Sequence, residues 1–233
     1  MSVVSVIVPI RKRIEAGSPR RLILASASPR RQAAFRLLGL PFEVSAAEVD
    51  ESPHQGELPA DLVLRLSLAK ARAVAAGTDG LALVVGADTA VAFEGESLGK
   101  PGSVEKARQM LLRLRGQIHQ VHSAIAMIDT ESGRESACLS TTQVQMRNYA
   151  LEEIEVYIAS GDPFDKAGAY AIQHSVFRPA MQVVGCYSNV MGVPLRLLVS
   201  GLQSAGLALD VDAQTLCPQF TGQTCTASCM EDT

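Results

Sequence analysis

The sequence has 233 residues and a formal net charge of −3, with 47% apolar and 19% charged residues. This length allows one large domain or two small ones, and the composition is ordinary for a globular protein. A negative net charge without a long basic stripe argues against a nucleic-acid surface, although a free nucleotide stays a candidate ligand. No apolar run approaches the length of a membrane span, and residues 1–13 carry their charges after the apolar stretch, the reverse of a secretory signal. We therefore expect a cytoplasmic protein with no membrane or nucleic-acid partner; the oligomeric state is left open, a homodimer included.

Residues 1–19 are interpreted as an N-terminal extension, and residues 21–38 predict a buried strand, a polar turn and the start of a helix. Ser28 is the expected N-cap, and Pro29 falls at the first helical position, where its missing N–H costs nothing. Arg30 and Arg31 then lie in the first turn, where two cations are unfavourable unless an anion joins them. Phosphate is the natural anion, because guanidinium groups bind its oxygens in pairs. A helix start with two solvated arginines is the alternative.

The clearest helix is predicted over residues 59–77, with Lys70 at the border of its buried face. Residues 81–85 predict a strand buried on both sides, which stops at residues 86–89 and resumes at residues 90–93. A hairpin turn at residues 94–96 and a second helix capped by Ser103 follow.

Between residues 117 and 146 the apolar periodicity changes to two, which predicts long antiparallel strands joined by a turn at Gly133. The elements expected after it are a helix over residues 151–160, a strand over 181–184 and a helix over 194–205. Residues 209–233 have little apolar periodicity and are predicted to be a disordered tail. The mixed order of strands and helices predicts an α/β domain over residues 20–208.

Several charged residues fall at the expected ends of buried strands, where ligands bind in open α/β sheets. They are Arg30, Arg31, Asp88, Lys100, Asp165 and Lys166. Asp88 suits a general base or a metal ligand, with a turn-forming aspartate as the alternative. Lys70 either reaches a phosphate or only extends from the edge of its helix. Residues 94–101 resemble a P-loop, but the two glycines are one residue too close and no Ser or Thr follows the lysine.

The histidines and cysteines do not suggest a metal site. His119 and His122 fall on opposite faces of a predicted strand, so they cannot bind one ion together, and we interpret both as structural or surface residues. Cys138 and Cys186 have apolar neighbours that favour buried, reduced thiols. The other three cysteines are Cys217, Cys225 and Cys229. Their spacing matches no zinc site, and we interpret them as incidental.

Seven motifs, in order, resemble those of the Maf-like proteins. They are S-x-S-P-R-R at residues 26–31, V-D-E at 49–51, L-x-x-x-K-A at 66–71, G-A-D-T at 86–89, L-G-K-P at 98–101, D-K-A-G-A-Y-x-I-Q at 165–173 and N-V-x-G-x-P at 189–194. The resemblance covers residues 21–203. It implies a Maf/ITPase-like fold, an elongated mixed sheet with flanking helices and an active-site cleft between two lobes. It also implies a nucleoside triphosphate pyrophosphatase, which releases a nucleoside monophosphate and pyrophosphate with a divalent cation.

The resemblance also implies roles for individual residues. Asp88 matches the family's proton acceptor. The three positions that separate the subfamilies hold Arg30, Thr89 and Gln173, as in the branch specific for dTTP and UTP. Mg²⁺ or Mn²⁺ is expected to bridge phosphate oxygens to Asp88 and Glu51. The residues expected to bind the phosphates are Ser28, Arg31, Lys70, Lys100 and Lys166.

Some positions depart from the family pattern, and two other functions stay open. Asp162 stands where Glu is usual, Ala171 and His174 where Gly is usual, and Ser123 where Thr is usual. One alternative is the same chemistry on 7-methyl-GTP or other modified nucleotides, although that branch usually has different residues at the first two subfamily positions. The other is a nucleotide-binding regulator of septum formation and cell division, which the presence of both Asp88 and Lys100 disfavours.

Overall fold

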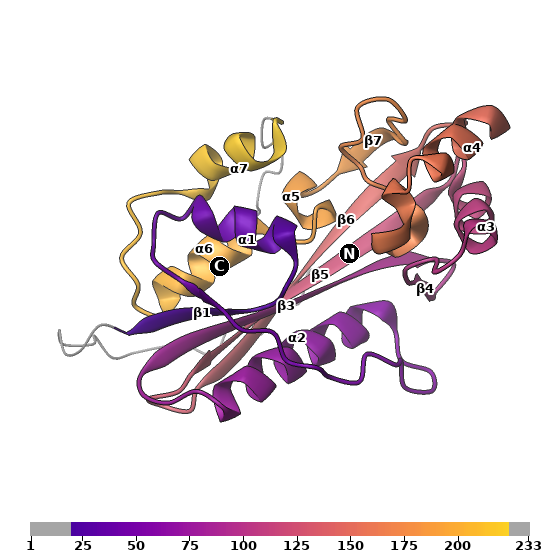
Figure 1. Cartoon of the computed structure of the whole chain (residues 1–233). Helices are drawn as coiled ribbons and strands as arrows, with labels where there is room; N and C mark the ends of the chain where they lie inside the picture. Colours follow the sequence, from indigo (N-terminus) through magenta and orange to yellow (C-terminus); the bar gives the residue numbers. More distant parts are fainter. Residues whose placement is uncertain (1–19, 224–233) are drawn as a thin grey trace.

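The computed structural model describes residues 20–223 and shows one mixed sheet with helices on both faces (Figure 1). The strands are β1 (Arg21–Ala25), β2 (Glu43–Val44), β3 (Ala82–Phe93), β4 (Glu96–Leu98), β5 (Ile118–Asp129), β6 (Glu135–Met146) and β7 (Ala180–Val184). The α-helices are α1 (Pro29–Arg36), α2 (Pro59–Ala76), α3 (Val104–Leu114), α4 (Leu151–Ala159), α5 (Tyr187–Val190), α6 (Leu195–Ser204) and α7 (Ala213–Thr221). Two short 3₁₀ helices, η1 (Asp162–Asp165) and η2 (Ala167–Ala169), follow α4. The predicted α/β class is confirmed.

The sheet has the strand order β2-β1-β3-β5-β6-β7, and β4 pairs with the far end of β3. β1 is parallel to both β2 and β3, whereas the remaining pairs are antiparallel. β3 is continuous because β5 pairs with it residue by residue from Leu83 to Ala92. The predicted stop at residues 86–89 is therefore wrong, and Asp88 lies within a strand instead of after one.

Helix α2 covers one face of the sheet, and the other helices divide the opposite face into two packed ends (Figure 1). At one end α1, α6 and α7 bury an apolar cluster that includes Leu24, Phe35 and Leu198. At the other end α3 and α4 bury a second cluster around Leu111 and Ile154. These two ends correspond to the two lobes that the family resemblance implies, and the long strands β3 and β5 run through both.

The edge of β3 that faces β1 is open in its middle. β1 pairs with β3 only as far as Gly86, and β4 pairs with it only from Val91 onward. Among the described strands, none pairs with residues 87–90 on that side. The gap lies at the carboxyl end of β1, where ligands bind in open α/β sheets. Side chains of β1, α1 and α2 can therefore converge on Asp88 and Thr89 there.

Gly86 brings α2 against β3 next to this gap. A Cβ atom built on Gly86 would lie 2.9 Å from the backbone nitrogen of Ala71, closer than real Cβ contacts, so the helix can pack here only against glycine. Ser67 is fully buried at the same contact. This packing fixes the position of Lys70, one residue before Ala71, relative to Asp88, two residues after Gly86.

The C-terminal region differs from the disorder predicted for residues 209–233. Asp212 begins α7 as an N-cap, because its Oδ1 accepts a 2.7 Å hydrogen bond from the backbone nitrogen of Thr215. Leu216 and Cys217 are 1% and 3% exposed and belong to the apolar cluster of α1 and α6. The prediction is wrong for α7, which is part of the core; residues 224–233 and the extension 1–19 lie outside the described residues.

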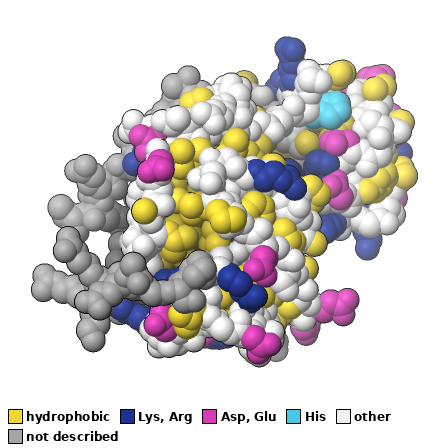
Figure 2. Space-filling model, turned by 60° about the vertical axis from the view of Figure 1, so that its left-hand side comes forward, with side chains coloured by type: hydrophobic (Ala, Val, Ile, Leu, Met, Phe, Trp, Pro, Cys, Tyr) yellow, Lys and Arg dark blue, Asp and Glu magenta, His cyan; other side chains and the backbone are white. Residues whose placement is uncertain are grey.

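No helix within residues 20–223 is both long enough and apolar enough to cross a membrane. On the face shown in Figure 2, Lys and Arg side chains are interspersed with Asp and Glu side chains, so this face carries no continuous basic surface. The cytoplasmic location and the homodimer stay predictions.

Candidate active site

The turn between β1 and α1 is held by the hydroxyl of Ser26. Ser26 is 7% exposed, and its Oγ accepts hydrogen bonds from the backbone nitrogen of Ser28 at 3.3 Å and from Arg31 Nη1 at 3.2 Å. Ser28 is the N-cap residue of α1, as predicted, but its side chain makes no capping hydrogen bond. The Ser28 hydroxyl therefore stays available at the mouth of the turn, while Ser26 shapes the backbone.

Arg31 connects α1 to the lobe boundary. Its Nε donates to the carbonyl of Gly192 at 3.2 Å, and its Nη2 donates to Thr89 Oγ1 at 3.2 Å. Burial lowers the pKa of Arg31, while the nearby Asp88 carboxylate opposes that shift. An arginine keeps its proton in such an environment, so the site holds one fixed positive charge. Thr89, a predicted specificity residue, thus contacts Arg31 directly.

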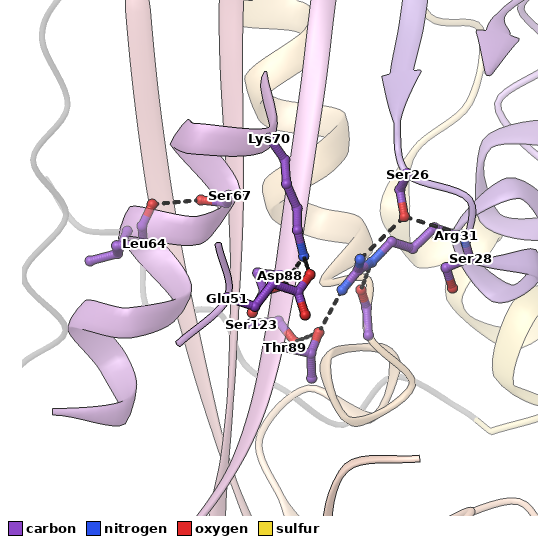
Figure 3. A network of polar contacts seen from close by, with 11 residues as sticks. Ser26, Ser28, Arg31, Glu51, Leu64, Ser67, Lys70, Asp88, Thr89 and Ser123 are labelled. Carbon is purple, nitrogen blue, oxygen red and sulfur yellow. Dashed lines mark hydrogen bonds and ion pairs between the residues drawn. The ribbon is translucent and has the colours of Figure 1, made fainter. Parts of the chain in front are cut away.

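The hydroxyl of Thr89 is itself held from the neighbouring strand. Thr89 Oγ1 and Ser123 Oγ lie 2.8 Å apart, and Ser123 donates to the carbonyl of Asn189 at 3.0 Å. Figure 3 shows these groups in a row that runs from Ser26 through Arg31 and Thr89 to Ser123. These hydrogen bonds hold the Arg31 guanidinium near Asp88, and none of them involves the Asp88 carboxylate.

The Asp88 carboxylate forms an ion pair with Lys70. Lys70 Nζ lies 2.6 Å from Asp88 Oδ1 and 2.5 Å from Glu51 Oε1, so one ammonium group joins two carboxylates. The side chains of Asp88 and Lys70 are only 12% and 13% exposed, whereas that of Glu51 is 63% exposed. The hydrogen bond from Lys70 lowers the pKa of Glu51, although partial burial opposes it. The two carboxylates thus lie close to one point, the ammonium group of Lys70 (Figure 3).

A cavity of about 570 Å³ lies between β1, α1, α2 and the loop of η1. Seven of the predicted site residues line it, namely Ser28, Arg30, Arg31, Glu51, Lys70, Lys100 and Lys166. Asp88 and Thr89 do not line the cavity directly; they lie behind Lys70 and Arg31, which contact them. The structure therefore brings the predicted phosphate-binding residues together around one hollow, with the predicted proton acceptor at its back.

Lys166 connects this cavity to the loop that ends at Gln173. Its Nζ donates to Asp162 Oδ1 at 3.0 Å and to Asp165 Oδ1 at 2.7 Å. The Tyr157 hydroxyl donates to Asp162 Oδ2 at 2.8 Å and accepts from the backbone nitrogen of Ala171 at 2.8 Å. The carboxylate of Asp162 therefore joins Lys166 to Tyr157, and an aspartate side chain is long enough to contact both.

Gln173 is not brought into this cavity. It is exposed, and its Nε2 donates to the backbone carbonyl of Thr221 at the end of α7, at 2.9 Å. It lines a second hollow of about 630 Å³, which lies between residues 172–188 and α7. Of the three predicted specificity residues, Arg30 therefore lines the first cavity, Thr89 lies behind it, and Gln173 lines the second.

The sequence reasoning missed the groups that hold Arg31. Ser26 and Gly192 belong to motifs that the sequence makes visible, but only the fold shows that a hydroxyl and a carbonyl accept from Arg31. Ser123 gave no signal beyond its departure from the family pattern. His119 and His122 lie on opposite strand faces as predicted, and they bond Tyr170 and Thr141, respectively.

The residues at the back of the cavity fit a hard divalent cation in part. Mg²⁺ is usually bound by one or two carboxylates together with substrate phosphates and water, and two carboxylates, Asp88 and Glu51, converge here on a single cationic group. Within residues 20–223 no group of three His, Cys, Asp or Glu side chains is arranged to bind a metal without such substrate ligands.

A model of Maf-like proteins matches residues 21–205, which include all of the site described above except α7. The chain belongs to the Maf family. The match ends at residue 205, before α7 begins at Ala213, so α7 lies outside it.

Relatives of known name align with most of this chain. The dTTP/UTP pyrophosphatase of Moorella thermoacetica is 47% identical over 75% of this chain and 90% of its own length. The dTTP/UTP pyrophosphatase of Symbiobacterium thermophilum is 43% identical over 80% of this chain and 95% of its own. Among solved structures, the Staphylococcus aureus Ham1 protein aligns with 80% of this chain and 100% of its own, at 15% identity and a TM-score of 0.46.

Proposed function

We propose that this protein hydrolyses dTTP and UTP to the nucleoside monophosphate and pyrophosphate. The observation that carries the proposal is the Asp88 carboxylate, which is held 2.6 Å from Lys70 at the back of a cavity lined with cations. The choice of substrate is supported by relatives at 41–47% identity that are named dTTP/UTP pyrophosphatases.

The charge of the cavity suits a triphosphate. The cations that line it are Arg30, Arg31, Lys70, Lys100 and Lys166. A nucleoside triphosphate carries roughly four negative charges, and positive groups fixed around phosphate oxygens stabilise the charge that moves onto the leaving group. The position of Arg31 is fixed by Ser26, Thr89 and Gly192, which all accept from its guanidinium.

The reaction requires a base for water. Asp88 accepts a proton from the water that attacks the α-phosphorus, the bond from that phosphorus to the bridging oxygen breaks, and pyrophosphate leaves with the electron pair. Lys70 has to release Asp88 before this step, and the incoming phosphates provide the alternative partner for its ammonium group. A divalent cation, Mg²⁺ or Mn²⁺, would be held by Asp88 and Glu51 and would neutralise charge on the phosphate oxygens.

Gln173 is proposed to select the nucleobase of the substrate, whereas Arg30 and Thr89 act nearer the phosphates. Uracil and thymine present an N3–H donor between two carbonyl acceptors, and an amide side chain can pair with two adjacent groups of that edge. The loop from Lys166, which lines the phosphate cavity, leads directly to Gln173. Thr89 acts on the phosphate-binding part of the site through Arg31, because its hydroxyl accepts a hydrogen bond from Arg31 Nη2.

The proposal is tested with purified full-length protein by measuring pyrophosphate release from dTTP, UTP, CTP, ATP, GTP and 7-methyl-GTP, with and without Mg²⁺. We expect dTTP and UTP to have the highest kcat/KM, and the activity to depend on Mg²⁺. Equal rates with CTP or GTP would overturn the specificity but keep the chemistry. Absence of pyrophosphate release from every nucleotide would overturn the activity itself.

A further inference from the structure

The contact between Gln173 and α7 fixes which way the Gln173 amide points. The acceptor is a backbone carbonyl, which cannot donate, so the side chain must present its nitrogen to Thr221 at 2.9 Å. The described residues give Gln173 no other side-chain hydrogen bond. Its second N–H and its Oε1 are therefore left for a ligand, in one fixed order.

Thr221 is itself well anchored. Its Oγ1 donates to the carbonyl of Cys217 at 2.7 Å and accepts from the backbone nitrogen of Gln223 at 3.0 Å. Gly222 then ends the helix with φ +69°, a conformation that favours glycine, and its nitrogen donates to the carbonyl of Pro218 at 2.9 Å. Leu216 and Thr221 are 1% and 5% exposed, so the end of α7 is packed against the rest of the protein.

We infer that α7 is a specificity element of this protein: the Thr221 carbonyl locks the Gln173 amide in the orientation that pairs with uracil and thymine. The inference rests on the proposed function, in which Gln173 reads the base. Thr221 is a positioning residue that acts through Gln173. The family match ends at residue 205, before α7 begins at Ala213, so the motifs shared with the family do not include Thr221.

The lock matters because an amide that is free to turn reads both pyrimidines. With its oxygen toward N3 and its nitrogen toward the group at C4, an amide accepts from the N3–H of uracil and donates to its O4. After a half-turn the nitrogen faces N3 and the oxygen faces the amino group of cytosine, which pairs equally well. A carbonyl that holds the nitrogen prevents this half-turn, so cytosine would leave polar groups unpaired.

The experiment compares two truncations. Deleting residues 219–233 removes the Thr221 carbonyl but keeps Leu216 and Cys217, and deleting residues 224–233 is the matched control that keeps the contact. The measurement is kcat/KM for UTP and for CTP. We expect the control to keep the UTP:CTP ratio within about twofold, and the longer deletion to lower it about three- to tenfold, the effect of one net hydrogen bond. An unchanged ratio in the longer deletion would overturn the inference.

Combining each truncation with Gln173→Ala separates this inference from the proposed function. If α7 acts through Gln173, the longer deletion changes the ratio no further in the Gln173→Ala background. An equal fall in both backgrounds would overturn the inference while leaving the proposed function intact. If Gln173→Ala alone leaves the ratio unchanged, Gln173 does not read the base, and both the proposed role of Gln173 and the lock are overturned.

A full-length variant keeps the test independent of truncation. Gly222→Val places a β-branched residue at φ +69°, which disfavours the end of α7 and displaces the Thr221 carbonyl while retaining the apolar anchors of the helix. Circular dichroism establishes that the variant is folded. We expect the same fall in the UTP:CTP ratio, and a ratio equal to that of the unmodified protein would overturn the inference.

Discussion

Lys70 Nζ lies 2.6 Å from Asp88 Oδ1, so the carboxylate proposed as the general base is paired with an ammonium group. The two residues are 18 positions apart and meet because α2 packs against β3 at Gly86. A buried carboxylate without such a partner is costly, and Lys70 compensates for its burial until phosphate arrives. The pair thus offsets the cost of burying each charge and connects phosphate binding to the release of Asp88.

Asp88→Asn is expected to remove activity while leaving nucleotide binding measurable. The amide cannot accept the proton from water, and loss of a general base lowers kcat by about 10²–10⁴-fold. The measurement is single-turnover pyrophosphate release from UTP, with binding followed separately by calorimetry. Asp79→Asn, at an exposed position in the turn after α2, is the matched control. More than a tenth of the original kcat in Asp88→Asn would remove Asp88 from this role.

Thr89→Val is expected to raise KM for UTP about tenfold and to lower kcat less. Valine has nearly the same shape but cannot accept from Arg31 Nη2 or bond Ser123, so the guanidinium loses one of its three acceptors. The effect falls on substrate binding, because Thr89 does not line the cavity and acts on the substrate only through Arg31, which does. Ser136→Ala on β6, at an exposed position, serves as the control. A change in kcat alone would show that Thr89 acts on the reaction and not on Arg31.

The sequence predicted most elements correctly where one periodicity dominated. The helix α2 and the hairpin β5–β6 follow from apolar spacing of helix and strand type, and both are confirmed. The interruption of β3 was wrong because Gly86 and Asp88 are typical turn residues, whereas pairing with β5 over the whole strand overrides local preference. Helix α7 was missed because Pro218 and several Thr and Gln residues conceal the spacing of Ala213, Leu216 and Cys217.

The candidate site was predictable in its residue types and not in its connections. Short motifs indicated that arginines, lysines and Asp88 serve one anion, and the structure places seven predicted residues around one cavity. The acceptors of Arg31 could not be predicted, since Gly192 lies 161 positions away and contributes only a backbone carbonyl. The contact between Gln173 and Thr221 was equally hidden, because it depends on a helix that the sequence reasoning assigned to disorder.

Leu216→Ala is expected to destabilise the protein by about 2–5 kcal/mol, the usual cost of a large-to-small change in a packed core. Leu216 is 1% exposed and packs in the cluster formed with α1 and α6. Urea unfolding followed by circular dichroism measures the free energy, and Gln219→Ala on the exposed side of α7 is the control. Equal stability of the two variants would show that α7 is not part of the cooperative core.

His119 is expected to make stability depend on pH between about 6.5 and 4. It is 2% exposed, its Nε2 lies 2.8 Å from the Tyr170 hydroxyl, and burial lowers its pKa to about 4 from an ordinary 6.5. Above pH 6.5 the imidazole is neutral in both states, so no penalty exists. As the pH falls from 6.5 toward 4, the unfolded chain takes up the proton and the folded one does not, which favours unfolding. At about 1.4 kcal/mol per pKa unit, the loss approaches roughly 3 kcal/mol near pH 4.

The pH dependence is isolated by comparing the protein with His119→Gln, whose amide can still bond Tyr170 but does not titrate. Urea unfolding at pH 7.5, 5.5 and 4.5 gives the free energy of each, and carboxylate titration, which both proteins share, cancels in the difference. We expect the variant to be the less stable at pH 7.5, because it fills the site less well, and the difference to shrink by about 2 kcal/mol at pH 4.5. His54→Gln, on an exposed histidine, is the matched control. A difference that stays constant with pH would show that His119 titrates normally and that its burial has no energetic effect on the fold.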